Sequence, residues 1–520
     1  MNNRFKESLL DKNRFSVTWE LVPGRGAREK AQEKAMEDSE FAFKGGKVDA
    51  MTITDMPGGN PAILADYLGM EVFQKGIEPL VHFTCKDRNR NQIESQLYSM
   101  DRANVRNLLV MTGDYEYSGF MGRGKPVFDL DVMHILELIE QMNKGLEYPG
   151  MKATIKHQAS DFFAGAACSP FKKTEAEQMI QYYKLKKKIE SGAKFIVSQL
   201  GYDVRKIHEL IQFMRQNGWD IPVIGNIYLL PLGAARLMNR NGLPGCVVPS
   251  KMVADLENES KAEDKGVQAR LVRAAKMYAI MKGLGYDGVH IGGHNMKYEQ
   301  LEFILEKGEE FSKNWMDYVP EFDYPIPDGF YYYEKDEKTG LNTDQPVERK
   351  GRPLDTKVEF TYRISNLMHH LMLEPGTPFW GPMKAIAKAV EGSSLEGAYH
   401  KFEHMAKVCI YDCKDCGDCA LGDVAYVCPM SNCPKNQRNG ACGGSWDGWC
   451  EVYGAKKKCA YVRAYSRLKN KGKEESLNGD IVPPPNWDFY QKASWINMYL
   501  GRDHNAKKYN VEYIPPKEKK

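Results

Sequence analysis

Eight short apolar runs alternate with longer amphipathic segments between residues 14 and 295. Nearly continuous apolar runs are typical of strands that are buried on both faces of a parallel sheet. Eight strand–helix units in about 280 residues predict a (β/α)8 barrel, a TIM barrel of the α/β class. The expected strands are 15–21, 48–54, 80–85, 107–112, 162–168, 195–200, 223–228 and 288–292.

The intervening segments have the signals of helices. Segments 61–74, 91–103, 131–143 and 175–191 are amphipathic, and the last begins with a capping box formed by Thr174 and Glu177 and ends at Gly192. A doubly wound open sheet is the alternative architecture. It is the weaker choice because no strand is followed by the G-x-G-x-x-G turn that marks dinucleotide binding in such sheets.

Polar and small residues gather directly after the expected strands. In a barrel, the carboxyl ends of all eight strands open into one mouth, where the active site lies. We therefore expect these side chains to converge, although they are far apart in the sequence. The residues are Glu20, Thr54, Asp55, His82, Gly113, Asp114, Cys168 and Gln199.

A second part of the chain follows the barrel. We expect a barrel domain over residues 1–310, a linker rich in aromatic residues and proline over 311–360, and a small helix-containing, cysteine-rich domain over 361–520. Helices are predicted at 362–373, 395–406 and 460–469.

Nine of the twelve cysteines lie between Cys409 and Cys459. The spacing C-x2-C-x2-C followed by a remote Cys-Pro is typical of [4Fe–4S] ligation. Structural zinc, which needs four thiolates per site, is a second interpretation, and one site of each kind is a third. Nine thiols suffice for two sites with one left over. The candidate ligands are Cys409, Cys413, Cys416, Cys419, Cys428, Cys433, Cys442, Cys450 and Cys459.

Composition limits the class of function. A net charge of +3 gives no global field for nucleic acid, and no run of about 18 apolar residues indicates a membrane span. The first residues lack the apolar core of a signal peptide, so we expect a cytoplasmic protein. In a reducing compartment, dense cysteine serves as ligands rather than as disulfides. We also expect a homo-oligomer.

Several segments resemble the methylenetetrahydrofolate reductase family. They are SVTWELVPGRG, PLVHFTCKDRNRNQIESQL, RNLLVMTGDY and the stretch from FFAGAACSPF to FIVSQLGYD, and together they span about residues 14–310. The cysteine window, with CGDCALGDVAYVCPMSNCPKNQRNGACGGSWDGWC, is similar to the C-terminal or partner domain of this family in anaerobes.

The resemblance implies a flavin in the barrel mouth and a folate stacked on it. The reaction it implies is the reduction of 5,10-methylenetetrahydrofolate to 5-methyltetrahydrofolate. Glu20 would be the general acid, with a raised pKa. Asp114 would lie between flavin and pterin, and Gln199 would hydrogen-bond the pterin.

The resemblance also assigns residues to the flavin, which could be FAD or FMN. Thr112 stands where bacterial members have arginine, and Cys168 replaces a tyrosine. Cys168 is then either redox active or a plain small side chain. Lys187 and Lys188 either reach the flavin phosphates or form a solvated helix face. The assigned residues are Thr54, His82, Thr112, Gly113, Asp114, Gly165, Ala166, Cys168, Lys187 and Lys188.

Two classes of function remain open from the sequence. In the first, electrons enter through the cysteine-rich domain from ferredoxin or another partner protein, or come from NADH directly at the flavin. In the second, the barrel is a non-redox folate-dependent methyltransferase or methyl-folate-binding module, and zinc holds the cysteine-rich domain together.

Overall fold

The computed structural model describes residues 3–517 and divides them into two compact units. The first unit comprises residues 3–181, 188–351 and 443–447, and the second comprises 182–187, 352–442 and 448–517. The chain thus crosses between the units several times. Each unit is described separately.

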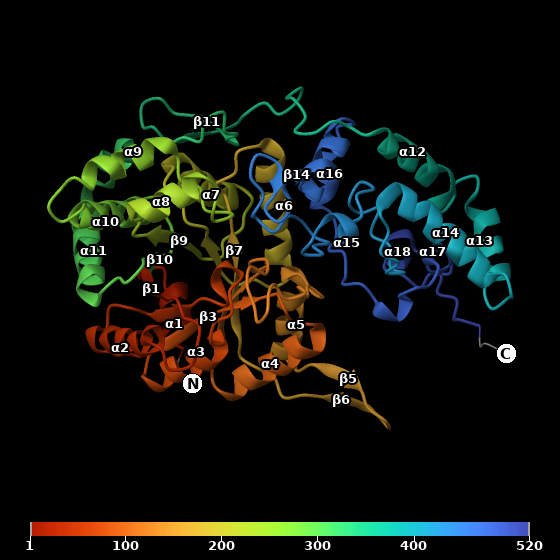
Figure 1. Cartoon of the computed structure of the whole chain (residues 1–520), viewed down its shortest axis with the longest axis horizontal. Coiled ribbons are helices and arrows are strands. Elements are labelled where there is room, and N and C mark those ends of the chain that lie inside the picture. The colour runs from red at the N-terminus through yellow and green to blue at the C-terminus, as the bar shows by residue number, and fades with distance from the viewer. Residues whose placement is uncertain (1–2, 518–520) are drawn as a thin grey trace. The chain divides into compact units, whose positions relative to one another are not determined.

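The first unit is a closed barrel of eight parallel strands in the order β1-β10-β9-β8-β7-β4-β3-β2 (Figure 1). All eight predicted strands are present, and the predicted (β/α)8 fold is confirmed. The barrel closes where Ser16 of the first strand pairs with Gly288 of the last. The strands are β1 (Ser16–Leu21), β2 (Ala50–Ile53), β3 (Glu78–Thr84), β4 (Asn107–Met111), β7 (Phe163–Cys168), β8 (Ile196–Ser198), β9 (Val223–Tyr228) and β10 (Gly288–Gly292).

Helices follow the strands around this barrel. The helix after β7 has the predicted capping box, because the Thr174 backbone N–H donates to Glu177 and the Glu177 N–H donates to the Thr174 hydroxyl. A short hairpin, β5 (Glu147–Pro149) and β6 (Thr154–Lys156), precedes β7. The helices are α2 (Lys30–Gly45), η1 (Pro57–Gly59), α3 (Ala65–Gln74), α4 (Arg90–Arg102), α5 (Val132–Lys144), α6 (Glu175–Glu190), α7 (Val204–Gln216), α8 (Leu232–Asn239), α9 (Ser250–Glu259), α10 (Val267–Gly283) and α11 (Tyr298–Phe311).

The amino-terminal helix α1 (Arg4–Leu10) closes the bottom of the barrel. Phe5 and Leu9 are fully buried in a cluster with residues from the strands and their amino-terminal approaches, including Leu109 and Phe163. Burial of one such side chain stabilises the fold by about 1.5–3 kcal/mol. Because the bottom is plugged, access to the barrel interior is from the mouth, at the carboxyl ends of the strands.

Residues 312–351 also belong to the barrel unit. They contain η2 (Ser312–Phe322) and a hairpin of β11 (Tyr333–Lys335) and β12 (Asn342–Pro346). Arg205 on α7 donates to the Asn342 side chain and to the Tyr333 carbonyl, which fixes the hairpin on the outside of the barrel.

The second unit contains short helices and one small hairpin. The predicted helix 460–469 is present with those bounds, and the helices predicted at 362–373 and 395–406 are present with shifted ends. The elements are α12 (Phe360–Met368), the π-helix η3 (His369–Leu373), α13 (Trp380–Val390), α14 (Glu396–Tyr411), α15 (Pro429–Asn432), β13 (Trp449–Cys450), β14 (Gly454–Lys458), α16 (Ala460–Lys469), η4 (Glu474–Asn478), η5 (Trp487–Phe489), α17 (Ser494–Tyr499) and α18 (Asn505–Tyr509).

Two short segments belong to a different unit from the residues on either side of them in the sequence. Gly443–Asp447, which comes between Cys442 and Cys450, belongs to the barrel unit, and Tyr182–Lys187 of α6 belongs to the second unit. Among residues 3–517, no helix is both long enough and apolar enough to cross a bilayer.

Candidate active site and thiol groups

Glu20 lies near the end of β1 and faces His290 on the neighbouring strand β10. The Glu20 Oε1 atom is 3.8 Å from His290 Nε2, and His290 Nδ1 is 3.0 Å from the Thr18 hydroxyl. The Glu20 side chain is 18% exposed and that of His290 is 5% exposed. The carboxylate therefore reaches the barrel mouth while an imidazole supports it from inside. Sequence reasoning missed His290, although the end of the last strand was a predicted mouth position.

The pKa of Glu20 differs in direction from the expectation. Burial alone would raise this pKa, but the hydrogen bond and charge of His290 outweigh burial and hold the pKa below its usual value. The expectation of a raised pKa is therefore wrong for the protein without ligands. The physical reason is the imidazole on β10, which strand pairing brings beside Glu20.

His82 on β3 is held neutral. Burial, followed by the charge of His290, lowers its pKa to about 4. The two imidazole rings are 6.5 Å apart between centroids. His82 Nε2 is buried and has no hydrogen-bond partner within the described part of the chain. Such an orphaned ring nitrogen indicates a place for a polar group of a bound molecule.

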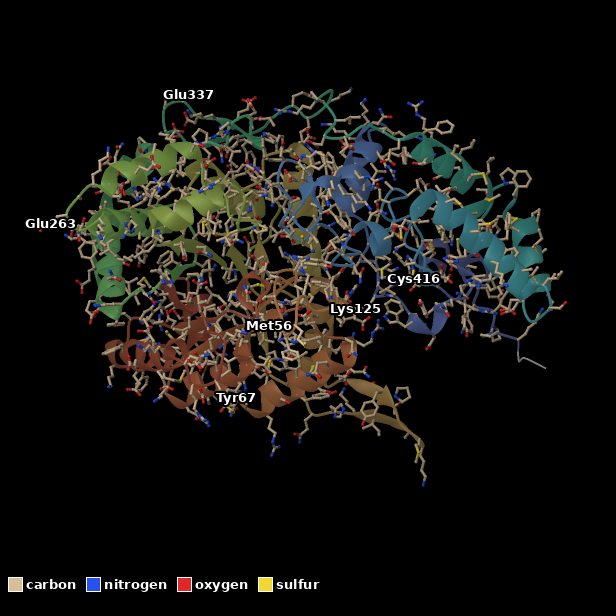
Figure 2. The ribbon with its side chains drawn as sticks, viewed as in Figure 1. Met56, Tyr67, Lys125, Glu263, Glu337 and Cys416 are labelled. Atoms are coloured by element: carbon tan, nitrogen blue, oxygen red, sulfur yellow. The ribbon has the colours of Figure 1, made fainter. Side chains whose placement is uncertain are left out.

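Asp114 is exposed and is held by the loop that follows β2. Its Oδ2 atom accepts a hydrogen bond of 2.7 Å from the Gly58 backbone N–H. Gly113 has φ of 83°, a conformation that L side chains rarely adopt. A Cβ atom on Gly59 would lie 2.0 Å from the Tyr115 carbonyl oxygen. The two loops, which carry Met56 and Lys125 in Figure 2, therefore pack backbone to backbone and fix the aspartate.

Thr54 follows β2 and is buried, with its hydroxyl 3.5 Å from the Leu21 carbonyl oxygen. Its neighbour Asp55, which was expected at the mouth but given no role, forms a buried network. Asp55 Oδ2 accepts from the Thr84 hydroxyl at 2.6 Å and from Arg88 at 2.9 Å. This ion pair fixes the ends of β2 and β3 beside His82.

Cys246 reports which side chains share the mouth. Burial raises its pKa to about 12, the charges of Asp114 and Glu20 raise it further, and Lys172 lowers it. Gln199 lies in the same region, because its Nε2 atom is 3.6 Å from a Cβ placed on Gly245. The charges of the predicted residues Glu20 and Asp114 thus both act on Cys246, which was not predicted, and the predicted Gln199 lies beside the preceding residue, Gly245.

The small residues of β7 have a packing explanation. A Cβ atom on Gly165 would lie 2.4 Å from the ring of Phe195, so this glycine makes room for a core aromatic. Ala166 is fully buried. Burial raises the pKa of Cys168 to about 11, although Lys188 and Lys172 oppose the shift. Cys168 is therefore a protonated thiol at neutral pH, which favours the plain small-side-chain interpretation.

The lysines near α6 have backbone partners. Lys188 donates to the Ala167 carbonyl, and Lys187 donates to the Asp480 carbonyl at 3.2 Å. Both are buried, which does not match a solvated helix face. Lys172 is fully buried and donates to the carbonyl oxygens of Gly443 and Ser445, so it anchors the segment that follows Cys442. Thr112 is buried directly after β4.

Four cysteines of the second unit line one cavity. We call Cys413, Cys416, Cys419 and Cys428 the first thiol group. They lie on the loops between α14 and α15, with Cys416 labelled in Figure 2. The backbone N–H of Asp415 lies 3.4 Å from Cys413 Sγ, and buried Lys407 faces Cys419 and Cys413. Such donors and cations stabilise thiolates that bind a metal.

Four further cysteines influence one another and form the second thiol group: Cys433, Cys442, Cys450 and Cys459. Burial raises the pKa of Cys459, and the nearby Cys442 and Cys433 raise it further. Burial also raises the pKa of Cys433, and Cys450 adds to that shift. Cys459 is the N-cap residue of α16. Cys409 belongs to neither group and is exposed.

The spacing of these thiols bears on the kind of metal site. In tetrahedral zinc sites, bonds of about 2.3 Å place the sulfur atoms about 3.8 Å apart. Among residues 3–517, the group with three potential ligand atoms within 4.8 Å of one another is Asp418, Asp503 and His504, which contains no cysteine. Both four-thiolate groups therefore leave the iron–sulfur and the zinc interpretations open.

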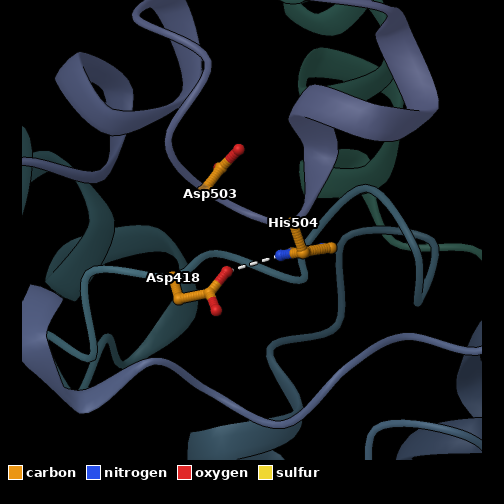
Figure 3. A group of neighbouring side chains, drawn as sticks. All are labelled: Asp418, Asp503 and His504. Atoms are coloured by element: carbon orange, nitrogen blue, oxygen red, sulfur yellow. Dashed lines mark hydrogen bonds and ion pairs between the residues drawn. The ribbon is translucent and has the colours of Figure 1, made fainter. Parts of the chain in front are cut away.

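The Asp418, Asp503 and His504 group is an ion-pair cluster rather than a metal site (Figure 3). His504 Nδ1 pairs with Asp418 Oδ1 at 2.5 Å, and Nε2 pairs with Asp423 Oδ2 at 2.9 Å. Burial alone would lower the pKa of His504, but these two carboxylates raise it to about 9. A doubly bonded imidazolium has no lone pair for a metal.

Comparisons with known proteins agree with this division of the chain. Residues 393–488 match the family described as "Methylene-tetrahydrofolate reductase C terminal". "Methylenetetrahydrofolate reductase 1" of Schizosaccharomyces pombe is 25% identical over 236 residues, 44% of this chain and 36% of that protein. "Methylenetetrahydrofolate reductase (NADH) 1" of Arabidopsis thaliana is 24% identical over 238 residues, 45% and 38% of the two chains. The chain thus spans well under half of the length of these relatives.

A solved structure also aligns with the chain. It is an uncharacterized protein from Clostridium thermocellum that binds two copies of 5-methyl-5,6,7,8-tetrahydrofolic acid, with a TM-score of 0.40 and 13% identity over 59% of this chain and 99% of that one. We base no conclusion on it. The match that decides the family covers residues 5–307, more than half of the chain and all eight strands, and its description is "Methylenetetrahydrofolate reductase". The chain belongs to the methylenetetrahydrofolate reductase family.

Proposed function

We propose that the chain catalyses the flavin-dependent reduction of 5,10-methylenetetrahydrofolate to 5-methyltetrahydrofolate in the barrel mouth. The observation that carries this proposal is the position of Glu20, a carboxyl group beside His290 and His82 at the mouth of a barrel that matches this family. His290 was not among the residues that the resemblance assigned, so its contact with Glu20 adds support that comes from the structure.

The residues present fit a flavin. The buried His82 Nε2 atom has no partner in the described chain and offers a hydrogen bond to a polar ring edge. Thr54, Thr112, Gly113 and Cys168 lie at the strand ends and would border the ring, whereas Gly165 and Ala166 lie inside β7, where Gly165 packs against Phe195. When bound, a reduced flavin supplies the hydride. FAD and FMN both remain compatible, because Lys187 and Lys188 have backbone partners.

Glu20 carries out the proton chemistry of the proposed reaction. Its protonated carboxyl donates to the folate ring nitrogen that bears the methylene bridge, and the bridge then opens to an iminium that can accept hydride. His290 holds the carboxylate at the mouth between turnovers. Bound substrate displaces water and removes the solvation that favours the charged form, which raises the pKa of Glu20 toward the working pH. Asp114 and Gln199 hydrogen-bond the pterin.

We propose that electrons enter through the two thiol groups. The C-x2-C-x2-C spacing with a later Cys-Pro is typical of [4Fe–4S] ligation, and the four cysteines that line one cavity suit such a cluster. Cys442 of the second thiol group is followed directly by Gly443, whose carbonyl oxygen binds Lys172 in the barrel unit. Ferredoxin or another donor protein would then supply electrons; NADH at the mouth is the alternative donor.

The non-redox alternative has less support. A folate-dependent methyltransferase with a structural zinc domain needs four thiolates for each zinc ion, whereas the C-x2-C-x2-C spacing is more typical of iron–sulfur ligation. A homo-oligomer and a cytoplasmic location remain predictions.

An anaerobic absorption spectrum with iron, sulfide, zinc and flavin analysis tests the proposal. We expect flavin bands, a broad shoulder near about 400 nm and close to eight iron atoms per chain, four for each four-thiolate cluster. A colourless protein that contains zinc and no flavin would exclude the proposed reaction.

A further inference from the structure

The second unit contains a cavity that the proposed reaction does not use. Its volume is about 500 Å³, within the range of about 300–1,000 Å³ that is common for small-molecule sites. The lining is mostly apolar and includes four methionines, which adapt readily to bound ligands. The apolar and aromatic lining residues are Ile364, Met368, Met372, Leu373, Met383, Phe402, Ala406, Ile410, Tyr411, Leu421, Tyr426, Trp495, Met498 and Tyr509.

This cavity shares a wall with the first thiol group. Lys407, Tyr411, Cys419, Leu421 and Ser494 line both the apolar cavity and the cavity that contains the four thiols. A molecule in the apolar cavity would therefore lie against the wall that contains Cys419. This arrangement favours a ligand that exchanges electrons over one with a purely structural role.

The charges of the cavity argue against a nucleotide. Among its lining residues, Lys407 is the one with a permanent positive charge, and it is already paired with Glu403 Oε1 at 2.5 Å and bonded to Ser494. A phosphate-bearing ligand would lack a counter-charge. His369 and Tyr509 provide neutral polar groups, with His369 Nε2 3.1 Å from the Tyr509 hydroxyl. Such groups suit carbonyl or hydroxyl oxygens.

The opening of the cavity is apolar. Ile364 and Met368 on α12, and Phe402 and Ile410 on α14, line the cavity and are also between 41% and 60% exposed. An apolar ligand or its substituent can therefore enter between these two helices. The far side includes the π-helix His369–Leu373, a local distortion of a kind that is frequent at functional sites.

We propose that this cavity binds a quinone-class ring: a planar, apolar ring that carries two carbonyl or hydroxyl oxygens. The ring lies among the methionine and aromatic side chains, and one oxygen meets the His369–Tyr509 pair. The lack of a free cation argues against nucleotides. The wall that the cavity shares with Cys419 favours a ring that carries electrons.

A redox role for this ligand rests on the proposed function, because it requires iron–sulfur chemistry at the first thiol group. A hydroquinone that gives up two electrons, one at a time, loses its two hydroxyl protons and becomes the quinone. The electrons would pass across the wall that contains Cys419 to the first thiol group. The protons pass to His369 and to Glu374, whose Oε1 lies 3.1 Å from His369 Nε2 and whose side chain is partly exposed.

Anaerobic calorimetric titration of the full-length holoenzyme with menadione, a soluble naphthoquinone, tests the binding. Ala406→Phe fills the cavity from α14, whereas Ala398→Phe places the same ring at an exposed position of the same helix. We expect saturable binding by wild type and A398F and at least tenfold weaker binding by A406F. No saturable binding by wild type, or equal binding by both variants, would overturn the site.

A second pair covers the case in which A406F does not fold. Ile364→Lys places a charge at the opening, and Phe360→Lys does so at an exposed position of α12 outside the cavity. We expect I364K, but not F360K, to lose binding. Menadiol should bleach the absorbance near about 400 nm in F360K and not in I364K; equal bleaching, or binding without bleaching, would overturn the electron-entry role. Menadione binding does not require flavin or iron, so failure of the proposed function is recognised separately.

Discussion

The Glu20 carboxylate and the His290 imidazole approach to 3.8 Å across neighbouring strands, and this contact affects the pKa of the carboxyl group proposed as the acid. His290 holds the pKa of Glu20 down against the effect of burial. If Glu20 is the acid of the proposed reaction, the histidine on the last strand would determine at which pH the glutamate on the first strand is protonated.

Replacing Glu20 by glutamine should remove the proton donor and leave the fold unchanged. We expect folate reduction to fall by about 10²- to 10⁴-fold, the usual contribution of a general acid. Reduction of the flavin by the electron donor needs no proton from this residue and should stay within a few-fold of wild type. Stopped-flow measurement of the two half-reactions separates these effects. Folate turnover within tenfold of wild type would show that Glu20 is not the acid.

Replacing His290 by asparagine should change the pH dependence of the reaction. His290 is a positioning residue that lowers the pKa of Glu20, so without it burial dominates and the pKa rises. More Glu20 is then protonated at a given pH, and the alkaline limb of the kcat/KM profile should move to higher pH. Thr18→Val, which removes only the hydroxyl 3.0 Å from His290 Nδ1, should cause a smaller change. An unshifted profile in H290N would contradict the assignment.

Replacing Gly292 by alanine should displace the Glu20 carboxylate. A Cβ atom at this position would lie 2.5 Å from Glu20 Oε2, closer than the atoms can approach. We expect a loss of folate turnover with intact flavin binding, measured by steady-state kinetics and flavin absorbance. Gly233→Ala on α8 is the matched control, because nothing lies within 4 Å of its added Cβ. Full activity in G292A would show that the carboxylate need not occupy its observed position.

The barrel was predictable because its strands are buried on both faces, so apolar runs alone locate all eight. Glu20, Asp114 and Gln199 were predictable from their positions after strands. The pair of Glu20 with His290 was not, because residues 270 positions apart meet only when the barrel closes. Likewise, the plug formed by α1 depends on the shape of the barrel bottom rather than on any local signal.

The cysteines show the same limit. The first thiol group follows from C-x2-C-x2-C and the next Cys-Pro. The second thiol group has spacings of nine, eight and nine residues, which match no ligand motif, and only folding brings Cys433 and Cys459 together. Sequence likewise gave no sign that Gly443–Asp447 would lie with the barrel, because that depends on the side chain of Lys172.

Single cysteine replacements should divide the metal content according to the two thiol groups. We expect Cys419→Ser and Cys459→Ser each to lose about half of the iron, because each removes one ligand of a different four-thiolate site. Cys409→Ser should keep all of it, since this exposed thiol belongs to neither group. Iron analysis and EPR spectra of the reduced variants measure the outcome. Iron loss in C409S equal to that in C419S would contradict the partition.

The His504 cluster should make the second unit less stable at alkaline pH. The pKa of His504 is raised to about 9 in the folded protein, against about 6.5 in an unfolded chain. A raised pKa stabilises the fold fully below pH of about 6.5, and the stabilisation is lost as pH rises through about 9; its upper bound is about 3 kcal/mol. Arg438, 3.4 Å from His504 Nδ1, opposes the charge and reduces this value.

We therefore expect the difference in free energy of unfolding between wild type and His504→Gln to shrink between pH 6 and pH 9.5. Anaerobic denaturant titrations at several pH values measure it, and a difference that stays constant over that range would mean that His504 is not charged in the folded protein.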